Sequence, residues 1–146
     1  MTINGKITMQ NGEVITFELY PESAPKTVEN FVKLVKEGYY DGKTFHRVIP
    51  GFVSQGGCPN GTGSGDLGYT IPCETEGNSH IHKEGAMSMA HRGLNTGCCQ
   101  FFIVHDSQPH LNGVHTVFGQ VLDNVKAARG MKNGDIMTSI TIEDNK

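Results

Sequence analysis

The chain has 146 residues, of which 36% are hydrophobic and 18% charged, and its formal net charge at pH 7 is −3. This length fits one domain with its own hydrophobic core, so we expect a single domain over residues 1–146. The weakly acidic balance argues against nucleic acid or an anionic membrane as a partner, and no segment could span a bilayer. The 19 glycines indicate many tight turns, which are typical of short strands rather than long helices.

The N-terminal segment lacks the basic start and apolar run of a secretory signal, so we expect a cytoplasmic protein. In that reducing compartment the cysteines should be free thiols. They are Cys58, Cys73, Cys98 and Cys99. For the adjacent pair Cys98-Cys99, burial as small hydrophobes is favoured over an oxidation-sensitive site.

The first predicted element is a β-hairpin. In residues 6–20, two segments of alternating polarity meet at Asn11-Gly12, a pair that favours hairpin turns. We therefore expect the chain to begin with two antiparallel strands.

A helix is predicted next, within residues 21–40. Its apolar residues fall at the spacing of one helix face: Val28, Phe31, Val32 and Val35. Pro25 suits the first turn of this helix, and Gly38 suits its C-terminal stop.

From residue 44 to 121 helical periodicity is absent, and short apolar runs alternate with Gly-rich or polar connections. These runs span residues 44–49, 52–55, 85–90, 100–105 and 115–122. A second short helix is predicted over 123–130, with Asp123 as N-cap and Gly130 at its end, and a last strand over 137–144. Many short strands without βαβ alternation favour a mainly β fold, and we expect a closed antiparallel barrel with a helix over each open end.

Three segments mix polar and apolar side chains as a small ligand pocket does. In the first, Arg47 and Gln55 flank Phe52 and Val53 across a Pro-Gly bend. The second, residues 87–105, and the third, residues 110–119, supply further aromatic, histidine and amide side chains. A structural role for Arg47, with its stem packed and its head in solvent, remains the alternative for the first segment taken alone.

Four stretches carry this mixture in a fixed order: FHRVIPGFVSQGG, GAMSMAHRG, QFFIVH and LNGVHTVFG. In this order and at these separations they resemble the cyclophilin-type peptidyl-prolyl cis-trans isomerases, over roughly residues 3–142. The similarity is greatest to the compact bacterial cytoplasmic members. It implies an eight-stranded antiparallel β-barrel capped by two α-helices, with the site on the outer face of the barrel.

The resemblance also implies roles for individual residues. It assigns catalysis to Arg47, Phe52 and Gln55, and substrate binding to Val53, Ala90, His91, Gln100, Phe102, His110, Leu111 and His115. Gln55 either holds the substrate backbone or orients the arginine. The expected substrates are proline-containing peptides and unfolded protein chains, the expected state is a monomer, and neither a metal nor another cofactor is expected.

Three positions depart from the family pattern. His110 stands where many members carry a tryptophan, Val53 replaces a common methionine, and His91 replaces a common asparagine. The set of arginine, phenylalanine and glutamine is intact, so isomerase activity is expected. Since the tryptophan contributes to binding of the cyclic peptide cyclosporin, we expect weaker inhibition by that drug.

Other interpretations are less favoured. Residues 63–68 match a dinucleotide fingerprint, but Pro72 stands where a helix should follow, so a loop is expected. The set Cys58, Cys73, His80 and His82 has no standard zinc spacing, and no nucleophile elbow supports a hydrolase. The main alternative to an isomerase is a non-catalytic module or holdase on the same fold that binds proline segments without turning them over.

Overall fold

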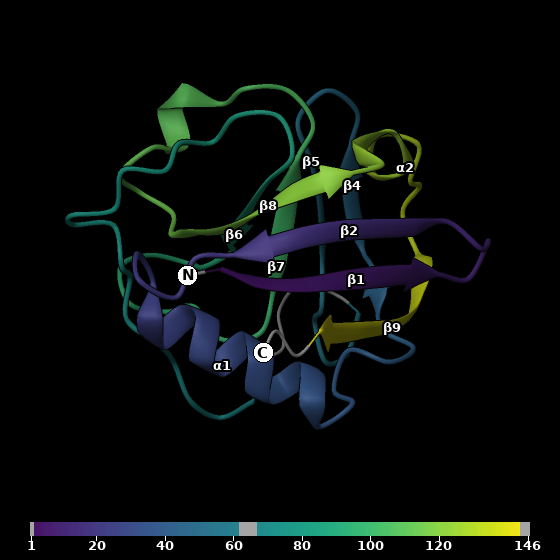
Figure 1. The fold of residues 1–146 in the computed structure, drawn as a ribbon, viewed down its shortest axis with the longest axis horizontal. Helices are drawn as coiled ribbons and strands as arrows, with labels where there is room; N and C mark the ends of the chain where they lie inside the picture. Colours follow the sequence, from purple (N-terminus) through teal and green to yellow (C-terminus); the bar gives the residue numbers. More distant parts are fainter. Residues whose placement is uncertain (1, 62–66, 144–146) are drawn as a thin grey trace.

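The computed structural model describes residues 2–61 and 67–143. In these ranges an antiparallel sheet of nine strands curves into a barrel, accompanied by two α-helices and one short 3₁₀-helix (Figure 1). The order of the strands in the sheet is β3-β9-β1-β2-β8-β6-β7-β5-β4. Their bounds are β1 Ile3–Met9, β2 Val14–Leu19, β3 Thr44–Phe45, β4 Arg47–Ile49, β5 Val53–Gly56, β6 Ala86–Met89, β7 Phe101–Val104, β8 Val117–Asp123 and β9 Asp135–Glu143.

The two strands at the ends of this order are halves of one chain segment, which explains why nine strands form where eight were expected. Only His46 separates β3 from β4. β3 pairs with β9, whereas β4 pairs with β5. A single extended segment therefore reaches both edges of the sheet and closes the barrel, as a closed barrel requires. The expected mainly β barrel with two helices is confirmed.

The predicted hairpin is β1 and β2, in which Thr8 lies opposite Val14. Gly12 has a φ of 94° in the connecting loop, a conformation that glycine adopts without a steric penalty. The turn closes with a hydrogen bond of 2.8 Å from the backbone N–H of Met9 to the carbonyl of Glu13.

The first predicted helix is α1, Pro25–Lys36. It begins at Pro25, whose missing N–H costs nothing in a first turn, and Gly38 follows its end with a φ of 76°. Its buried side adds Thr27 and Leu34 to the predicted stripe, whereas Val32 of that stripe is only partly buried.

The second predicted helix is α2, Val125–Arg129, and the expectation that Asp123 caps it is wrong. Asp123 is the last residue of β8, where it pairs with Thr16. Asn124 is the N-cap, in a left-handed conformation with φ of 71° that asparagine tolerates better than most residues. Its side-chain amide donates to the carbonyl of Val14 at 2.9 Å. This contact places α2 at the start of β2, whereas α1 follows the end of β2, so the helices lie at opposite ends of that strand.

The interior of the barrel is filled by aromatic and aliphatic side chains. Phe31 of α1 is 1% exposed and lies at the centre of a group of rings. Its ring centroid lies between 5.1 and 6.2 Å from those of Phe17, Tyr40, Phe101 and Phe118. These rings belong to one large cluster of buried side chains inside the barrel, which we call the interior cluster.

A second, smaller apolar cluster lies on the outer face of the sheet. It consists of Val53, Ala86, Phe102, Val104 and Val117, with Phe52, Ala90 and Leu111 packed against it. We call it the outer cluster. Leu111 belongs to the 3₁₀-helix η1, Pro109–Leu111, so a connecting segment contributes to this cluster. Because β6 and β7 bury both faces, their sequences do not alternate between apolar and polar residues.

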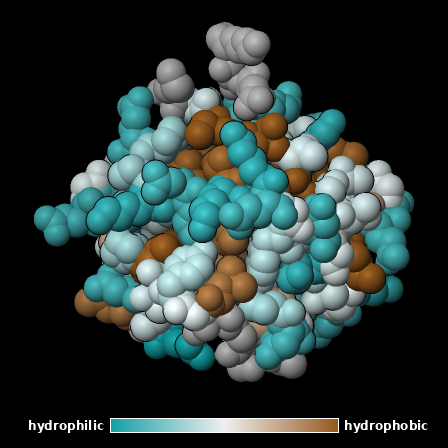
Figure 2. Space-filling model, turned by 90° about the horizontal axis from the view of Figure 1, so that it is seen from below, coloured by the Kyte–Doolittle hydropathy of each residue, from teal (hydrophilic) through white to brown (hydrophobic). Residues whose placement is uncertain are grey.

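Figure 2 shows the underside of the Figure 1 view, where hydrophilic side chains interrupt the apolar areas. In the described part of the chain, no helix combines the length and apolar character that crossing a membrane requires. The segment 63–68, expected to be a loop, lies outside the described residues except at its last two positions.

The four cysteines are free thiols. Cys58, Cys98 and Cys99 are buried, and Cys73 is partly exposed. Burial raises the pKa of Cys99 to about 12, even though a hydrogen bond from the Tyr39 hydroxyl lowers it in part. The burial of both side chains agrees with the interpretation of Cys98 and Cys99 as small hydrophobes.

Candidate active site

Three neighbouring strands align the central side chains of the candidate site. Arg47 on β4 pairs with Gln55 on β5, and Gln55 pairs in turn with Phe102 on β7. Residues directly opposite each other in a sheet project to the same face. Val48, which follows Arg47 on β4, and Ser54, which precedes Gln55 on β5, are buried. Because successive side chains of a strand project to opposite faces, the row of Arg47, Gln55 and Phe102 lies on the outward face of the barrel.

A short chain of hydrogen bonds fixes the amide of Gln55. The guanidinium Nη1 of Arg47 donates to Gln55 Oε1 at 3.3 Å, and Gln55 Nε2 donates to Gln100 Oε1 at 3.0 Å. The carbonyl side of the Gln55 amide therefore faces the guanidinium of Arg47, and its NH₂ side faces Gln100. Gln100 accepts the hydrogen bond from the NH₂ group of Gln55 and does not contact Arg47 in this chain of bonds.

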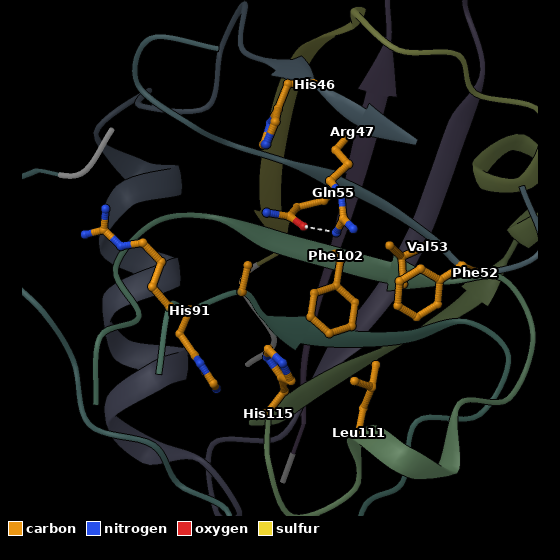
Figure 3. Close-up of a pocket in the computed structure, with 11 residues that line it drawn as sticks. His46, Arg47, Phe52, Val53, Gln55, His91, Phe102, Leu111 and His115 are labelled. Atoms are coloured by element: carbon orange, nitrogen blue, oxygen red, sulfur yellow. Dashed lines mark hydrogen bonds between the residues drawn. The ribbon is translucent and has the colours of Figure 1, made fainter. Parts of the chain in front are cut away.

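These residues surround a hollow of about 550 Å³. It is lined by His46, Arg47, Phe52, Val53, Gln55, Ala90, His91, Arg92, Phe102, Leu111 and His115. Figure 3 shows Arg47 and Gln55 on one side of it, Leu111 and His115 on the other, and Phe102 between them. All the residues expected at the site line it except Gln100 and His110.

The floor of the hollow is apolar. Phe102 is 4% exposed and Val53 is 2% exposed, so both present only a small part of their surface to solvent. Phe52 and Leu111, which pack on the outer cluster, form walls above them. A ligand that fits here would lose most of its water on the side that faces the protein.

His91 and His115 form one corner of the hollow. Their rings stack with centroids 4.0 Å apart and an interplanar angle of 14°. His115 Nδ1 donates to the carbonyl of Met89 at 2.9 Å, and His91 Nε2 donates to the carbonyl of Val114 at 2.8 Å. Burial lowers the pKa of His115, an effect that the Met89 carbonyl opposes and the neighbouring histidines reinforce. The neutral imidazole is therefore the form present at pH 7.

His110 and Gln100 lie beside the hollow and not in its lining. The exposed ring of His110 stacks on Phe52 with centroids 6.1 Å apart and an interplanar angle of 22°. It therefore extends the rim above the aromatic wall. This is the position at which the resemblance expects a tryptophan.

Two lining residues, His46 and Arg92, were not predicted. His46 separates β3 from β4, and its buried Nδ1 has no hydrogen-bond partner among the described residues. Burial lowers the pKa of His46, and the charge of Arg47 adds to this effect. The only feature of the sequence that could have indicated His46 is its position next to Arg47. In the same way, Arg92 directly follows the predicted site residue His91.

The histidines and cysteines of the possible zinc set lie apart in different bonding environments. Across residues 2–61 and 67–143, no group of three or more His, Cys, Asp or Glu side chains is arranged to hold a metal ion. His80 stacks on Tyr20 at 3.8 Å, and Cys58 bonds Asn60 at 3.0 Å.

Fold and hollow together define a class: an antiparallel β-barrel with two helices that carries an apolar pocket, edged by an arginine and a glutamine, on its outer face. Comparison with known proteins agrees with this class. The family model described as cyclophilin type peptidyl-prolyl cis-trans isomerase/CLD matches residues 5–145.

Curated relatives extend over nearly the whole chain. Peptidyl-prolyl cis-trans isomerase B of Bacillus subtilis (strain 168) is 64% identical over 139 residues, which cover 95% of this chain and 97% of the relative. A peptidyl-prolyl cis-trans isomerase of Synechococcus elongatus is 57% identical over 130 residues, 88% of each chain.

Solved structures agree as well. A crystal structure of a cyclophilin type peptidyl-prolyl cis-trans isomerase from Cryptosporidium parvum has a TM-score of 0.90, 32% identity and full coverage of both chains. A structure of that protein in the presence of the dipeptide Ala-Pro has a TM-score of 0.88 and 32% identity, and the match covers 97% of this chain and 99% of that one. The chain belongs to the cyclophilin-type peptidyl-prolyl cis-trans isomerases and is an isomerase of X–Pro peptide bonds.

Proposed function

We propose that Arg47, Phe52 and Gln55 perform this isomerisation at the hollow on the outer face. An X–Pro bond rotates slowly because its C–N bond has partial double-bond character. In the twisted state that resonance is lost and the prolyl nitrogen gains a lone pair. A guanidinium N–H directed at this nitrogen binds the twisted form and not the planar one, as acceleration requires. Arginine suits the role because it keeps its charge and its fork has a fixed geometry.

The single observation that carries the proposal is the position of Arg47. Its guanidinium lines an apolar hollow and is oriented by a hydrogen bond of 3.3 Å to Gln55. Rotation breaks no covalent bond, so the chemistry requires no nucleophile, metal or redox cofactor.

We assign the substrate proline ring to Val53, Phe102 and Leu111, with Phe52 and His115 as walls. This apolar surface holds the ring while the remainder of the peptide rotates. It also removes water from the planar amide, whose polar resonance form loses more by desolvation than the twisted form does. Ala90, His91 and Gln100 are assigned to the adjoining peptide groove, and His110 to its rim.

The energies indicate that Arg47 does not act alone. Raising a rate of about 0.01 s⁻¹ to some hundreds per second needs roughly 6 kcal/mol. One hydrogen bond to a charged group supplies about 1.5–3 kcal/mol. Positioning and desolvation in the hollow must therefore supply the rest.

The expected partners are proline-containing peptides and unfolded chains. The structure of the Cryptosporidium relative in the presence of the dipeptide Ala-Pro supports the first of these. We also propose that residues 1–146 act as one isomerase domain and as a monomer. The free thiols fit a reducing, cytoplasmic compartment. Cyclosporin should inhibit weakly, because His110 offers less apolar surface than a tryptophan.

The test is an isomerisation assay on an Ala-Ala-Pro-Phe peptide with wild type, Arg47→Ala and Arg47→Lys. We expect Arg47→Ala to lower kcat/KM at least about tenfold while the fold persists, as loss of a charge-assisted bond implies. Arg47→Lys should recover only part of the activity because it restores the charge without the fork. Near-normal turnover in Arg47→Ala would contradict the assignment. Peptide binding without turnover in wild type would favour the binding module instead.

A further inference from the structure

His82 is a buried histidine that the proposed mechanism does not use. It is 1% exposed and lies in the segment between β5 and β6. Its Nε2 lies 2.8 Å from the hydroxyl of Ser88, and its Nδ1 lies 2.9 Å from Oδ1 of Asn112. The backbone N–H of His82 donates to the same Asn112 oxygen at 2.8 Å.

The bonds to Asn112 place a proton on Nδ1 of the ring. Asn112 Oδ1 accepts a hydrogen bond from a backbone N–H, so it is the carbonyl oxygen, and Nδ1 of His82 must carry the proton that it donates. Burial lowers the pKa of His82, which favours the neutral ring, and the Ser88 hydroxyl lies within hydrogen-bond distance of both Nε2 and the carbonyl of Thr116, at 2.8 and 3.0 Å. A histidine bonded to a serine on one side and to an orienting side chain on the other is also the arrangement found in some hydrolases. However, Ser88 is 0% exposed, so no substrate can reach its hydroxyl.

The same ring also supports the apolar hollow. It stacks with Phe102 at a centroid distance of 6.0 Å and an interplanar angle of 18°. It meets His115 edge-on at 6.4 Å. His82 therefore contacts two residues that line the hollow without lining it itself.

His82 holds the Leu111 turn, residues 108–112, at both ends. Its carbonyl accepts from the backbone N–H of Gln108 at 2.8 Å, while Asn112 accepts its two N–H groups at the other end. Leu111, which forms a wall of the hollow, lies between these two attachments. Turns on the surface are otherwise the more mobile parts of a fold.

We propose that His82 is a positioning residue of the isomerase, which uses Ser88 and Asn112 to hold Phe102 and the Leu111 turn in the shape that receives the proline ring. This inference rests on the site assignment above. Apolar contacts are not directional, so the shape of such a hollow depends on what fixes its walls. A loosened wall should bind the ring less well in the planar and twisted states alike. The loss should therefore appear in KM and not in kcat.

The first test uses Asn112, which is exposed, so its truncation should leave folding intact. Asn112→Ala removes the acceptor for both N–H groups of His82. We expect KM for an Ala-Ala-Pro-Phe peptide to rise about three- to tenfold with kcat within about twofold, as loss of uniform binding predicts. Asn112→Asp keeps the acceptor oxygen and should restore a KM near the wild-type value.

The second test substitutes the ring and has a matched control. His105 is also a buried histidine with a serine partner, Ser54, at 2.8 Å, but its side chain does not line the hollow. His82→Phe and His105→Phe each remove a histidine–serine bond from the protein interior. We expect KM to rise in His82→Phe only. The backbone amides of Leu111 and His115, which bond within this region at 3.1 and 3.2 Å, should exchange faster in that variant only.

Each outcome decides the matter. An unchanged KM in both Asn112→Ala and His82→Phe would overturn the inference. So would equal rises in His82→Phe and His105→Phe without a rise in Asn112→Ala, because general destabilisation would then explain the effect. An error in the site assignment itself would be detected differently, by NMR titration of the wild-type protein with the peptide. The peptide would then perturb signals away from Phe102 and Leu111, and the inference about His82 would fail together with the site assignment.

Discussion

The interior cluster and the outer cluster share strands β6, β7 and β8 but serve different purposes. In the interior cluster, aromatic rings pack around Phe31, and almost all members of the cluster are apolar. The outer cluster is small, and two arginines, two glutamines and several histidines border it. The first supplies apolar burial for stability, while the second leaves an apolar hollow open beside a fixed cation.

The division runs between consecutive residues. On β7, Phe101 belongs to the interior cluster and Phe102 to the outer cluster. On β5, Ser54 bonds inward to the carbonyl of Ala128 at 2.9 Å, whereas Gln55 bonds outward to Arg47. Strand pleating alone separates stability from the proposed catalysis, because successive side chains project to opposite faces.

The largest effect is expected inside the barrel. Phe31→Ala removes a ring packed against four others and should lower the free energy of unfolding by about 3–5 kcal/mol. Urea unfolding would measure this loss. Because Phe31 does not touch the hollow, kcat/KM per folded molecule should stay within about twofold of wild type. A larger loss in the folded fraction would show that the two clusters are not separable.

A smaller effect with the opposite pattern is expected from Gln55→Ala. Loss of the bond that orients Arg47 should lower kcat by about three- to tenfold, in line with a hydrogen bond of about 0.5–1.5 kcal/mol. Unfolding in urea should change little. Gln120→Ala is a matched control, since Gln120 is a half-buried glutamine on β8 that bonds the carbonyl of Glu84 at 2.8 Å, away from the hollow. Similar activity losses in both variants would contradict an orienting role.

A graded effect of pH is expected on stability. Burial lowers the folded-state pKa of His82, His105 and His115 below the ordinary value near 6.5. Below that pH the unfolded chain binds more protons than the folded one, so the free energy of unfolding should fall as pH decreases. The contribution is fully present above about pH 6.5. Urea unfolding at about pH 7.5, 6.5 and 5.5 would show it, and greater stability at the lowest pH would contradict it.

The smallest effect is expected at the rim. His110 is exposed and its ring stacks on Phe52 at the rim, so His110→Trp should leave stability unchanged. The larger ring adds apolar surface and should tighten cyclosporin binding about two- to tenfold. Titration of isomerase activity with the drug would measure this. Equal inhibition of wild type and His110→Trp would show that the rim does not contribute.

Most of the fold could be predicted from local patterns. The Asn11-Gly12 pair indicated the hairpin, and the helical spacing from Val28 to Val35 indicated α1. The wrong cap at Asp123 arose because a favourable cap residue also fits the end of a strand. That choice depends on its pairing with Thr16, which is a long-range contact.

The residues of the site also divide into those that the sequence indicated and those that depend on long-range contacts. Sequence motifs indicated most of the residues that line the hollow, but for His46 gave only its position next to Arg47, and gave no reason to connect His82 with Phe102. From its residue type alone, His82 was a candidate metal ligand. Its position behind the hollow follows from bonds to Ser88 and Asn112, residues 6 and 30 positions away in the chain.

The sequence by itself determined the kinds of element, the two α-helices, the barrel class and the residue types of the candidate site. Turn chemistry, periodicity and motif order are local properties that side chains carry with them. Only the tertiary structure decided how the segment from Thr44 to Ile49 divides to close the barrel, and which faces of β6 and β7 are buried. Those features depend on strand register and on the packing of distant segments, which set the free energy of the whole chain and not of any one stretch.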